Sequence, residues 1–248
     1  MHKLFKFLTI LVIIFFWQFF SVIEVIPKIF LPSPYSIVIE YSKLAFQFDF
    51  WIDVYSTLWR TLFSVCIAVC FGVPVGLLMG ISQKIYSQLE FIVDFMRSIP
   101  ATALFPLFML LFGIGDFSKV ALAAWTSFLT IVVNSMYGVH QSKQLRYKSA
   151  QLMKLKGVEL ISHIALPEAA PQIANGVKTS LSLALIVVIV TELLIGTHTG
   201  LGKRITTAQQ IYDIEAMYAA IILTGIIGYL LNLTFVKLER KTFHWIGK

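Results

Sequence analysis

Long apolar stretches recur along this sequence at a length that suits helices crossing a bilayer. A transmembrane helix needs about 20 consecutive, mostly apolar residues to cross the hydrocarbon core. The stretches of this kind are residues 5–23, 57–81, 99–114, 120–139, 179–197 and 215–236. Lipid cannot satisfy backbone N–H and C=O groups, so each stretch must be helical. The sequence therefore predicts an all-α, polytopic membrane protein with about six transmembrane helices.

The composition supports this class and argues against a soluble domain. Charged residues make up only 13% of the chain and apolar residues 58%, whereas soluble domains have about 25% charged residues. No repeat or linker divides the chain, so we predict a single transmembrane domain over residues 1–248. The net charge of +7 does not predict nucleic-acid binding, because the basic residues lie at the ends of apolar stretches.

The distribution of basic residues also predicts the orientation. Six spans put both termini on one side, and most of the 20 Lys and Arg residues then fall on that side. The positive-inside rule places both termini and the polar loop at about 141–178 in the cytoplasm. Lys3 and Lys6 before the first stretch imitate a signal peptide. The stretch is long and lacks a small-residue cleavage site, which favours a retained helix.

The external segment 24–56 carries signals of a turn followed by a helix. Residues 31–34 read Leu-Pro-Ser-Pro, which predicts an extended turn because residues before proline avoid the helical region. Residues 37–48 then suggest a short amphipathic helix at the membrane interface. Trp51 and Tyr55 are expected at the level of the lipid headgroups.

Polar residues inside the apolar stretches are candidates for a transport path. Glu192 stands alone in its stretch, and a carboxylate in the membrane should face protein or water rather than lipid. Ser127 and Asn134 are seven residues apart, and so share a helical face. All three could line a solute path, while helix–helix hydrogen bonding is the simpler explanation. Glu192 could also cap a neighbouring helix or lie near the outer mouth with little role.

Small residues in the second stretch predict close helix packing. Gly72, Gly76 and Gly80 recur every four residues, which lets another helix approach closely. A helix that slides during transport would need the same glycines, although packing is favoured. Cys66 and Cys70 in the same stretch are interpreted as packing residues rather than as a disulfide or metal site.

Signals of catalysis, cofactors and metals are lacking in the sequence. The five histidines are scattered, and no zinc-protease or nucleophile-elbow motif occurs. Residues 200–204 read Gly-Leu-Gly-Lys-Arg and fail the phosphate-loop pattern, since Arg204 stands where Ser or Thr is required. We therefore predict no catalytic, metal-binding or cofactor-binding residue in this chain.

The cytoplasmic loop resembles the coupling loop of ABC-importer membrane subunits. That loop reads Glu-Ala-Ala, three residues, Gly, nine residues, Ile-x-Leu-Pro, and residues 164–167 read Ile-Ala-Leu-Pro. This register places Lys148 at the Glu position and Lys154 at the Gly position. The candidate coupling residues are Lys148, Ser149, Ala150, Lys154, Gly157, Ile164, Leu166 and Pro167.

Other segments are similar to the nitrate, sulfonate and taurine branch of these permeases. They run in order through nearly the whole chain, at residues 30–34, 57–60, 72–78, 97–100, 104–108, 113–119, 200–202 and 238–241. The resemblance implies the type I ABC-importer permease fold in a bacterial inner membrane. It does not identify the solute, for which a sulfonate, a nitrate-like anion and a vitamin precursor remain open.

The resemblance also implies partners and a mechanism. A second permease copy or a paired permease would complete the solute path, and an external solute-binding protein would deliver cargo. A short coupling helix between Pro167 and Pro171 would contact cytoplasmic ATPase subunits, which would bind ATP and Mg²⁺. Lys148 in place of Glu leaves three explanations open: drift, a changed charge in the ATPase groove, or weak coupling by this subunit beside a different paired permease. Gly157 is expected to supply the turn that Lys154 cannot.

Two alternatives remain. A stand-alone secondary transporter or channel would need several charges inside the membrane, and the sequence offers chiefly Glu192. A membrane scaffold or enzyme would need an identifiable interaction or catalytic set, and none is found.

Overall fold

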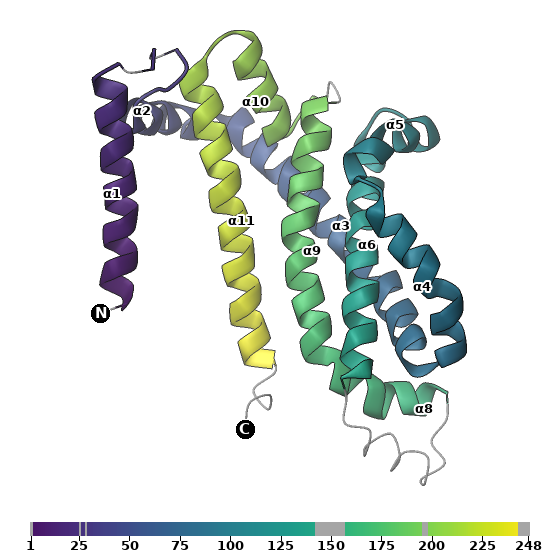
Figure 1. The fold of residues 1–248 in the computed structure, drawn as a ribbon. Helices are drawn as coiled ribbons and strands as arrows, with labels where there is room; N and C mark the ends of the chain where they lie inside the picture. The colour runs from purple at the N-terminus through teal and green to yellow at the C-terminus, as the bar shows by residue number, and fades with distance from the viewer. Residues whose placement is uncertain (1, 25, 28, 142–156, 195–197, 243–248) are drawn as a thin grey trace. The chain divides into compact units, whose positions relative to one another are not determined.

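The computed structural model describes residues 2–24, 26–27, 29–141, 157–194 and 198–242, and these ranges contain helices and no strand (Figure 1). Before the polar loop, the helices are α1 (His2–Val22), α2 (Pro34–Ala45), α3 (Phe48–Ile81), α4 (Gln83–Ser98), α5 (Ala101–Phe112) and α6 (Asp116–His140). After it come α8 (Val158–Leu160), the π-helical turn η1 (Ile161–Ala165), α9 (Leu166–Leu194), α10 (Leu201–Gln210) and α11 (Ile214–Thr242). The predicted all-α class is confirmed.

Among the described residues, four helices are long and apolar enough to cross a membrane. They are α3, α6, η1 continued by α9, and α11. The pair α4 and α5 adds a fifth if it is counted as one span, although it bends by 97°. A shorter apolar helix, Leu8–Val22, lies within α1.

The predicted span over residues 99–114 contains a helix, α5, but this helix does not cross a membrane alone. Between α4 and α5 the chain leaves the helix at Ile99, where φ is −82° and ψ is 122°. The following residue is Pro100, which disfavours the helical region for the residue before it and has no N–H to continue α4. The 12-residue α5 would be only about 18 Å long, which is too short to cross a bilayer alone.

The chain groups into two compact units, which are described separately. One comprises Met1–Ser56 with Gly196–Ile227, and the other comprises Thr57–Ile195 with Gly228–Lys248. The single transmembrane domain over the whole chain stays a prediction.

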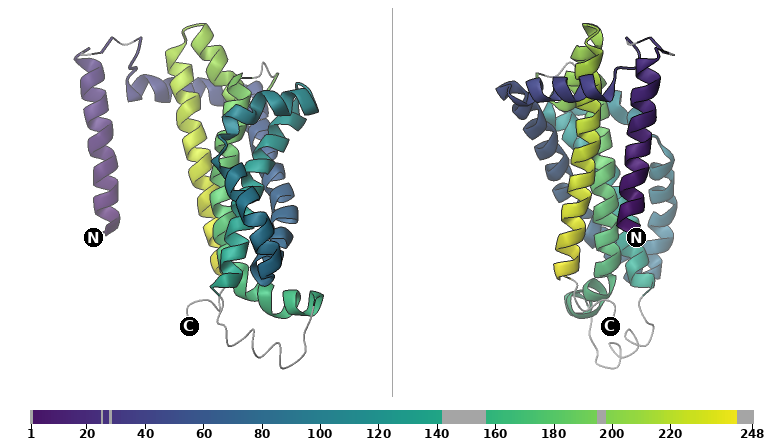
Figure 2. Two further views of the ribbon diagram at one scale, coloured as in Figure 1. Left: turned by 45° about the vertical axis from the view of Figure 1, so that its right-hand side comes forward. Right: turned by 90° about the vertical axis from the view of Figure 1, so that its left-hand side faces the viewer.

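In the first unit, the turn before α2 has the predicted extended backbone. Ser33 has φ −73° and ψ 146°, and its hydroxyl caps α2 by accepting a hydrogen bond from the Ser36 N–H. Pro34 occupies the first helical position, where its fixed φ suits a helix start. The helix therefore begins three residues before the predicted start at residue 37. The indole N–H of Trp17 donates to the Pro32 carbonyl at 3.1 Å and ties the turn to α1. From this turn α2 runs transverse to α1 (Figure 2).

In the second unit, α6 and α9 run side by side (Figures 1 and 2). Small residues allow this close approach. A Cβ on Gly138 would lie 2.9 Å from Ala169, and a Cβ on Gly176 would lie 2.7 Å from Cβ of Asn134. Leu122 on α6 and Val188 on α9 are buried together in one apolar cluster.

The glycines of α3 form a packing face, as predicted. A Cβ on Gly72 would lie 3.0 Å from Ile131, and a Cβ on Gly80 would lie 2.5 Å from Val139. A Cβ on Gly76 would collide with the backbone of Val132. The stripe therefore lets α3 lie directly against α6.

The prediction of a short helix bounded by Pro167 and Pro171 is wrong. Both prolines lie inside the continuous helix α9. Pro167 is its second residue and follows η1, where the Leu166 N–H bonds the Ile161 carbonyl five residues earlier. This wider turn gives the proline ring room, so the helical path continues.

Candidate functional site

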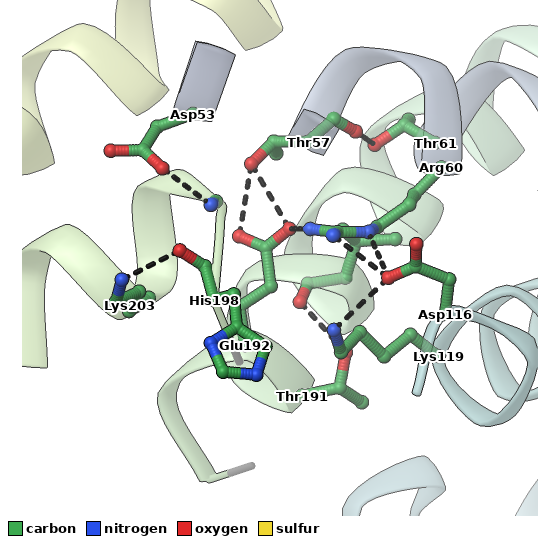
Figure 3. Close-up of polar contacts among 12 residues, drawn as sticks. Asp53, Thr57, Arg60, Thr61, Asp116, Lys119, Thr191, Glu192, His198 and Lys203 are labelled. Carbon is green, nitrogen blue, oxygen red and sulfur yellow. Dashed lines mark hydrogen bonds and ion pairs between the residues drawn. The ribbon is translucent and has the colours of Figure 1, made fainter. Parts of the chain in front are cut away.

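A buried ion pair joins two helices of the second unit that are far apart in sequence. Arg60 on α3 donates through Nη1 to Oε1 of Glu192 on α9 at 2.5 Å. Their side chains are 3% and 0% exposed. The Thr57 hydroxyl also lies within hydrogen-bond distance of both Glu192 carboxylate oxygens, at 3.1 and 2.9 Å (Figure 3). Thr57 lies about one helical turn before Arg60, so both side chains reach the same carboxylate.

The start of α6 adds a second carboxylate and a second cation. Arg60 donates through Nε and Nη2 to Oδ1 of Asp116 at 2.9 and 2.8 Å. Lys119, one turn along α6, donates to the same oxygen at 3.3 Å. Lys119 is 1% exposed, whereas the Asp116 side chain is 46% exposed. We call these five residues, Thr57, Arg60, Asp116, Lys119 and Glu192, the charge cluster.

The charge cluster balances two cations against two carboxylates. Arg60 lies between Glu192 and Asp116, and Lys119 shares Asp116. Buried ion pairs are tolerated when each charge has a partner with good hydrogen-bond geometry. The cluster therefore cross-links α3, α6 and α9, and the residues that the structure describes include no metal-type grouping of His, Cys, Asp and Glu.

The sequence reading missed most of this cluster. Glu192 faces protein, as expected for a carboxylate in an apolar stretch, but its partner was not predicted. Arg60 and Lys119 lie at the ends of apolar stretches in the sequence, yet both belong to the same network as Glu192. A signal for Arg60 did exist. Thr57, Arg60 and Ser64 fall on one face of α3, and all three are buried.

Ser127 and Asn134 lie elsewhere. The hydroxyls of Ser127 and Ser180 each donate to the backbone carbonyl of the other, at 3.5 and 3.2 Å. Asn134 donates to the Thr130 carbonyl of its own helix at 2.8 Å. Ser180 lies twelve residues from Glu192, or about 18 Å along α9. Ser127 therefore links α6 to α9 without joining the charge cluster. A transport role for Ser127, Asn134 and Glu192 stays a prediction.

The described part of the predicted coupling segment has one anchored face and one exposed face. Ala165 and Ala169 are fully buried in a cluster with Leu77 and Val139. Leu166 is 41% exposed, and Pro167 is also exposed. Ile164 lies in η1 and is half-buried.

Gly157 precedes this segment in a left-handed conformation, with φ 57°. That backbone favours glycine and agrees with the expected turn. Lys148, Ser149, Ala150 and Lys154 lie outside the described residues, so their predicted roles stay predictions.

In the first unit, a second polar group fixes the start of α10. Asp53 accepts a hydrogen bond from the Gly200 N–H at 2.8 Å and another from Nε of Arg204 at 2.7 Å (Figure 3 draws the first). The Arg204 guanidinium lies 5.4 Å from the ring centre of Phe50, a cation–π distance. At the glycine-rich start of α10, the Gly200 N–H and the Arg204 side chain thus both bind Asp53 of the same unit.

Comparisons with known proteins agree with this architecture. Residues 72–244 match the family described as binding-protein-dependent transport system inner membrane component. The chain is 29% identical over 235 residues to the putative aliphatic sulfonates transport permease SsuC of Bacillus subtilis, covering 94% of this chain and 84% of that protein. The protein of the same name from Escherichia coli is 31% identical over 229 residues, covering 92% and 87%.

The fold also matches solved structures. An inward-facing structure of the MetNI methionine ABC transporter aligns with a TM-score of 0.68 at 21% identity, covering 76% of this chain and 94% of that chain. At this identity the match concerns the fold alone, which is that of a type I ABC-importer permease. The chain therefore belongs to the family of inner-membrane components of binding-protein-dependent transport systems.

Proposed function

We propose that this chain is the permease subunit of an ABC importer, forming the path through which a small solute crosses the bacterial inner membrane. The observation that carries the proposal is the nearly full-length similarity to permeases named for aliphatic sulfonate transport. The long apolar helices of the second unit, held together by the glycine packing face and the charge cluster, suit a membrane-spanning path.

We further propose an organic sulfonate as the solute, with a nitrate-like anion or a vitamin precursor as alternatives within the same class of importer. The names of the two relatives support the sulfonate. An anion needs cationic or N–H groups along its route, and Arg97, whose side chain is 48% exposed, is such a group in the second unit.

Coupling to a separate ATPase is the second part of the proposal. The exposed Leu166 and Pro167 would contact a cytoplasmic ATPase subunit, while the buried Ala165 and Ala169 hold the segment against its own helices. An anchored segment with one exposed face can transmit displacement into α9. ATP and Mg²⁺ would bind in that partner, with both termini of this chain in the cytoplasm.

The remaining partners follow from the same scheme. A second permease copy or a paired permease would complete the solute path, and an extracytoplasmic binding protein would deliver the solute. Affinity purification of the tagged permease from mild detergent should retain an ATPase subunit, and Leu166→Asp should release it because a charge would enter the contact. Retention of the ATPase by Leu166→Asp at the level of the wild type would contradict the assigned contact.

Uptake by reconstituted vesicles tests the transport function. Vesicles that contain the permease with its ATPase and binding protein should accumulate radiolabelled taurine only when ATP is present on the ATPase side. Replacing ATP by a non-hydrolysable analogue is the matched control. Uptake by the permease alone would overturn the proposal.

One observation favours the rival function of a stand-alone secondary transporter. Charges buried within the helices are expected in such proteins, and the charge cluster has more of them than the sequence suggested. The cluster charges are paired with each other, however, as in a structural cross-link. Solute uptake driven by a proton or sodium gradient without ATPase would support the rival.

A further inference from the structure

A cavity with a mostly apolar lining opens beside the bend between α4 and α5. Its volume is about 260 Å³. The end of α4, the bend, the start of α5, one face of α6 and Leu183 of α9 line it. All these segments belong to the second unit. The volume lies slightly below the range of about 300–1,000 Å³ that is typical of sites for larger ligands, so the cavity suits a small solute.

One residue that lines this cavity has an unsatisfied hydrogen-bond donor. Trp125 lines it from α6, and its indole Nε1 is buried without a hydrogen-bond partner. Within the described part of the chain, the other buried side-chain atom in this state is Oγ of Ser135. A buried N–H without a partner costs about 1–3 kcal/mol. Because Nε1 is closed to solvent, a ligand with an acceptor oxygen would reach it and remove this cost only after the indole ring turns towards the cavity.

The cavity is also lined by a cation that can exchange its weak ion pair with Asp94 for a contact with a bound anion. Arg97 is the one charged residue in the described lining. Its nearest salt-bridge distance, from Nη1 to Oδ1 of Asp94, is 3.7 Å, and the two side chains are 48% and 66% exposed. Exposed pairs of this kind contribute little. Arg60 and Lys119 differ, because they are buried and held by carboxylates at 2.5–3.3 Å.

The rest of the lining suits a small anion with an apolar body. Pro100 caps α5 without a side-chain hydrogen bond, so the positive end of the α5 dipole lies at the cavity beside Ala101. Leu104, Leu129 and Leu183 supply apolar contacts. No carboxylate of the described residues lines the cavity, which disfavours a cationic solute.

We propose that this cavity binds the anionic group of a small organic anion of the sulfonate type, with the Arg97 guanidinium as one donor to its oxygens and Trp125 Nε1, brought to the cavity by a turn of the indole ring, as the other. The proposal rests on the proposed function and assigns a solute-binding site within the permease. It makes Trp125 and Arg97 specificity-determining residues for the solute.

Equilibrium binding to the purified permease tests the site without requiring transport. Radiolabelled ethanesulfonate is the probe, and unlabelled ethyl methyl sulfone is a neutral competitor of similar shape. We expect saturable binding that the sulfone does not displace. Trp125→Phe removes the N–H and keeps a ring, and should weaken binding about tenfold, as expected for a hydrogen bond to a charged group. Arg97→Gln should weaken it at least about tenfold.

Matched controls make the same chemical changes outside the cavity. Trp51→Phe removes an indole N–H that already donates to the Ala45 carbonyl at 2.9 Å. Lys84→Gln removes an exposed cation from the same helix as Arg97. Both controls should bind ethanesulfonate as the wild type does.

The outcomes separate the site from the proposed function. Absence of saturable binding by the wild type, or unchanged binding by both Trp125→Phe and Arg97→Gln, overturns the site even if ATP-driven uptake occurs. Displacement by the neutral sulfone overturns the assignment of an anion. Failure of ATP-driven uptake with cavity-dependent binding intact overturns the importer function and leaves the site standing.

Discussion

Breaking the Arg60–Glu192 pair should destabilise the protein strongly, and Glu192→Gln does so with little change of shape. The wild-type charge cluster is neutral, because Arg60 and Lys119 face Asp116 and Glu192. Glu192→Gln leaves one positive charge in excess. The charge left without its partner is that of the Arg60 guanidinium, and the Arg60 side chain is only 3% exposed. Removing one partner of a buried pair costs about 3–5 kcal/mol.

The double variant Arg60→Gln, Glu192→Gln separates this effect from simple loss of packing. With both charges removed, Lys119 and Asp116 remain as a balanced pair. The free energy of unfolding should therefore be less reduced in the double variant than the sum of the two single changes, with a coupling of about 2 kcal/mol or more between these contacting residues.

The measurement is unfolding of the detergent-solubilised protein by increasing SDS, followed by fluorescence of its five tryptophans. Lys43→Gln is the control, since Lys43 forms an equally well-placed pair with Glu40 at 2.7 Å on an exposed surface. It should not change the unfolding midpoint measurably. Additive single effects, or a loss below about 1 kcal/mol for Glu192→Gln, would refute the reasoning that the pair is buried and mutually required.

Three further changes test separate parts of the structure. Gly76→Leu should destabilise the protein by about 1–3 kcal/mol or more in the same SDS assay, because the added side chain collides with α6; Gly225→Ala, where a Cβ meets nothing within 4 Å, is the matched control. Ser33→Ala should cost about 1 kcal/mol by removing the cap of α2, and Ser33→Asp, which restores a capping oxygen, should recover most of it. Lys148→Glu should lower solute-stimulated ATPase activity of the assembled transporter if the ATPase groove has adapted to lysine, and an unchanged rate would reject that adaptation.

Features set by local sequence could be predicted well. Apolar length indicates helices because lipid leaves the backbone no other partner, and α3, α6, α9 and α11 confirm this for four of the predicted spans. The glycine spacing in α3 also gave the correct packing face. Ser33 and Pro34 mark the start of α2 through a side-chain cap and a fixed φ, both local effects.

Features that depend on distant parts of the chain could not be predicted. Arg60 and Glu192 are 132 residues apart, and no periodicity in either helix indicates that they pair. Two predictions that involve prolines differ from the structure, for different reasons. Pro100 separates α4 from α5, so the predicted span at 99–114 is a short helix after a bend. Pro167 instead lies in a helix that continues because the preceding π turn makes room.

The unbroken course of α9 has a mechanical consequence. Pro167 and Glu192 lie on one helix, separated by 25 residues or about 38 Å of rise. If the helix pivots near Pro167 as a rigid rod, a tilt of about 5° moves its Glu192 end by about 3 Å, which follows from that length. The Arg60–Glu192 contact at 2.5 Å would not survive such a displacement unless α3 moved with it. A tilt of α9 that begins near Pro167 would therefore either break the Arg60–Glu192 ion pair or move α3 together with α9.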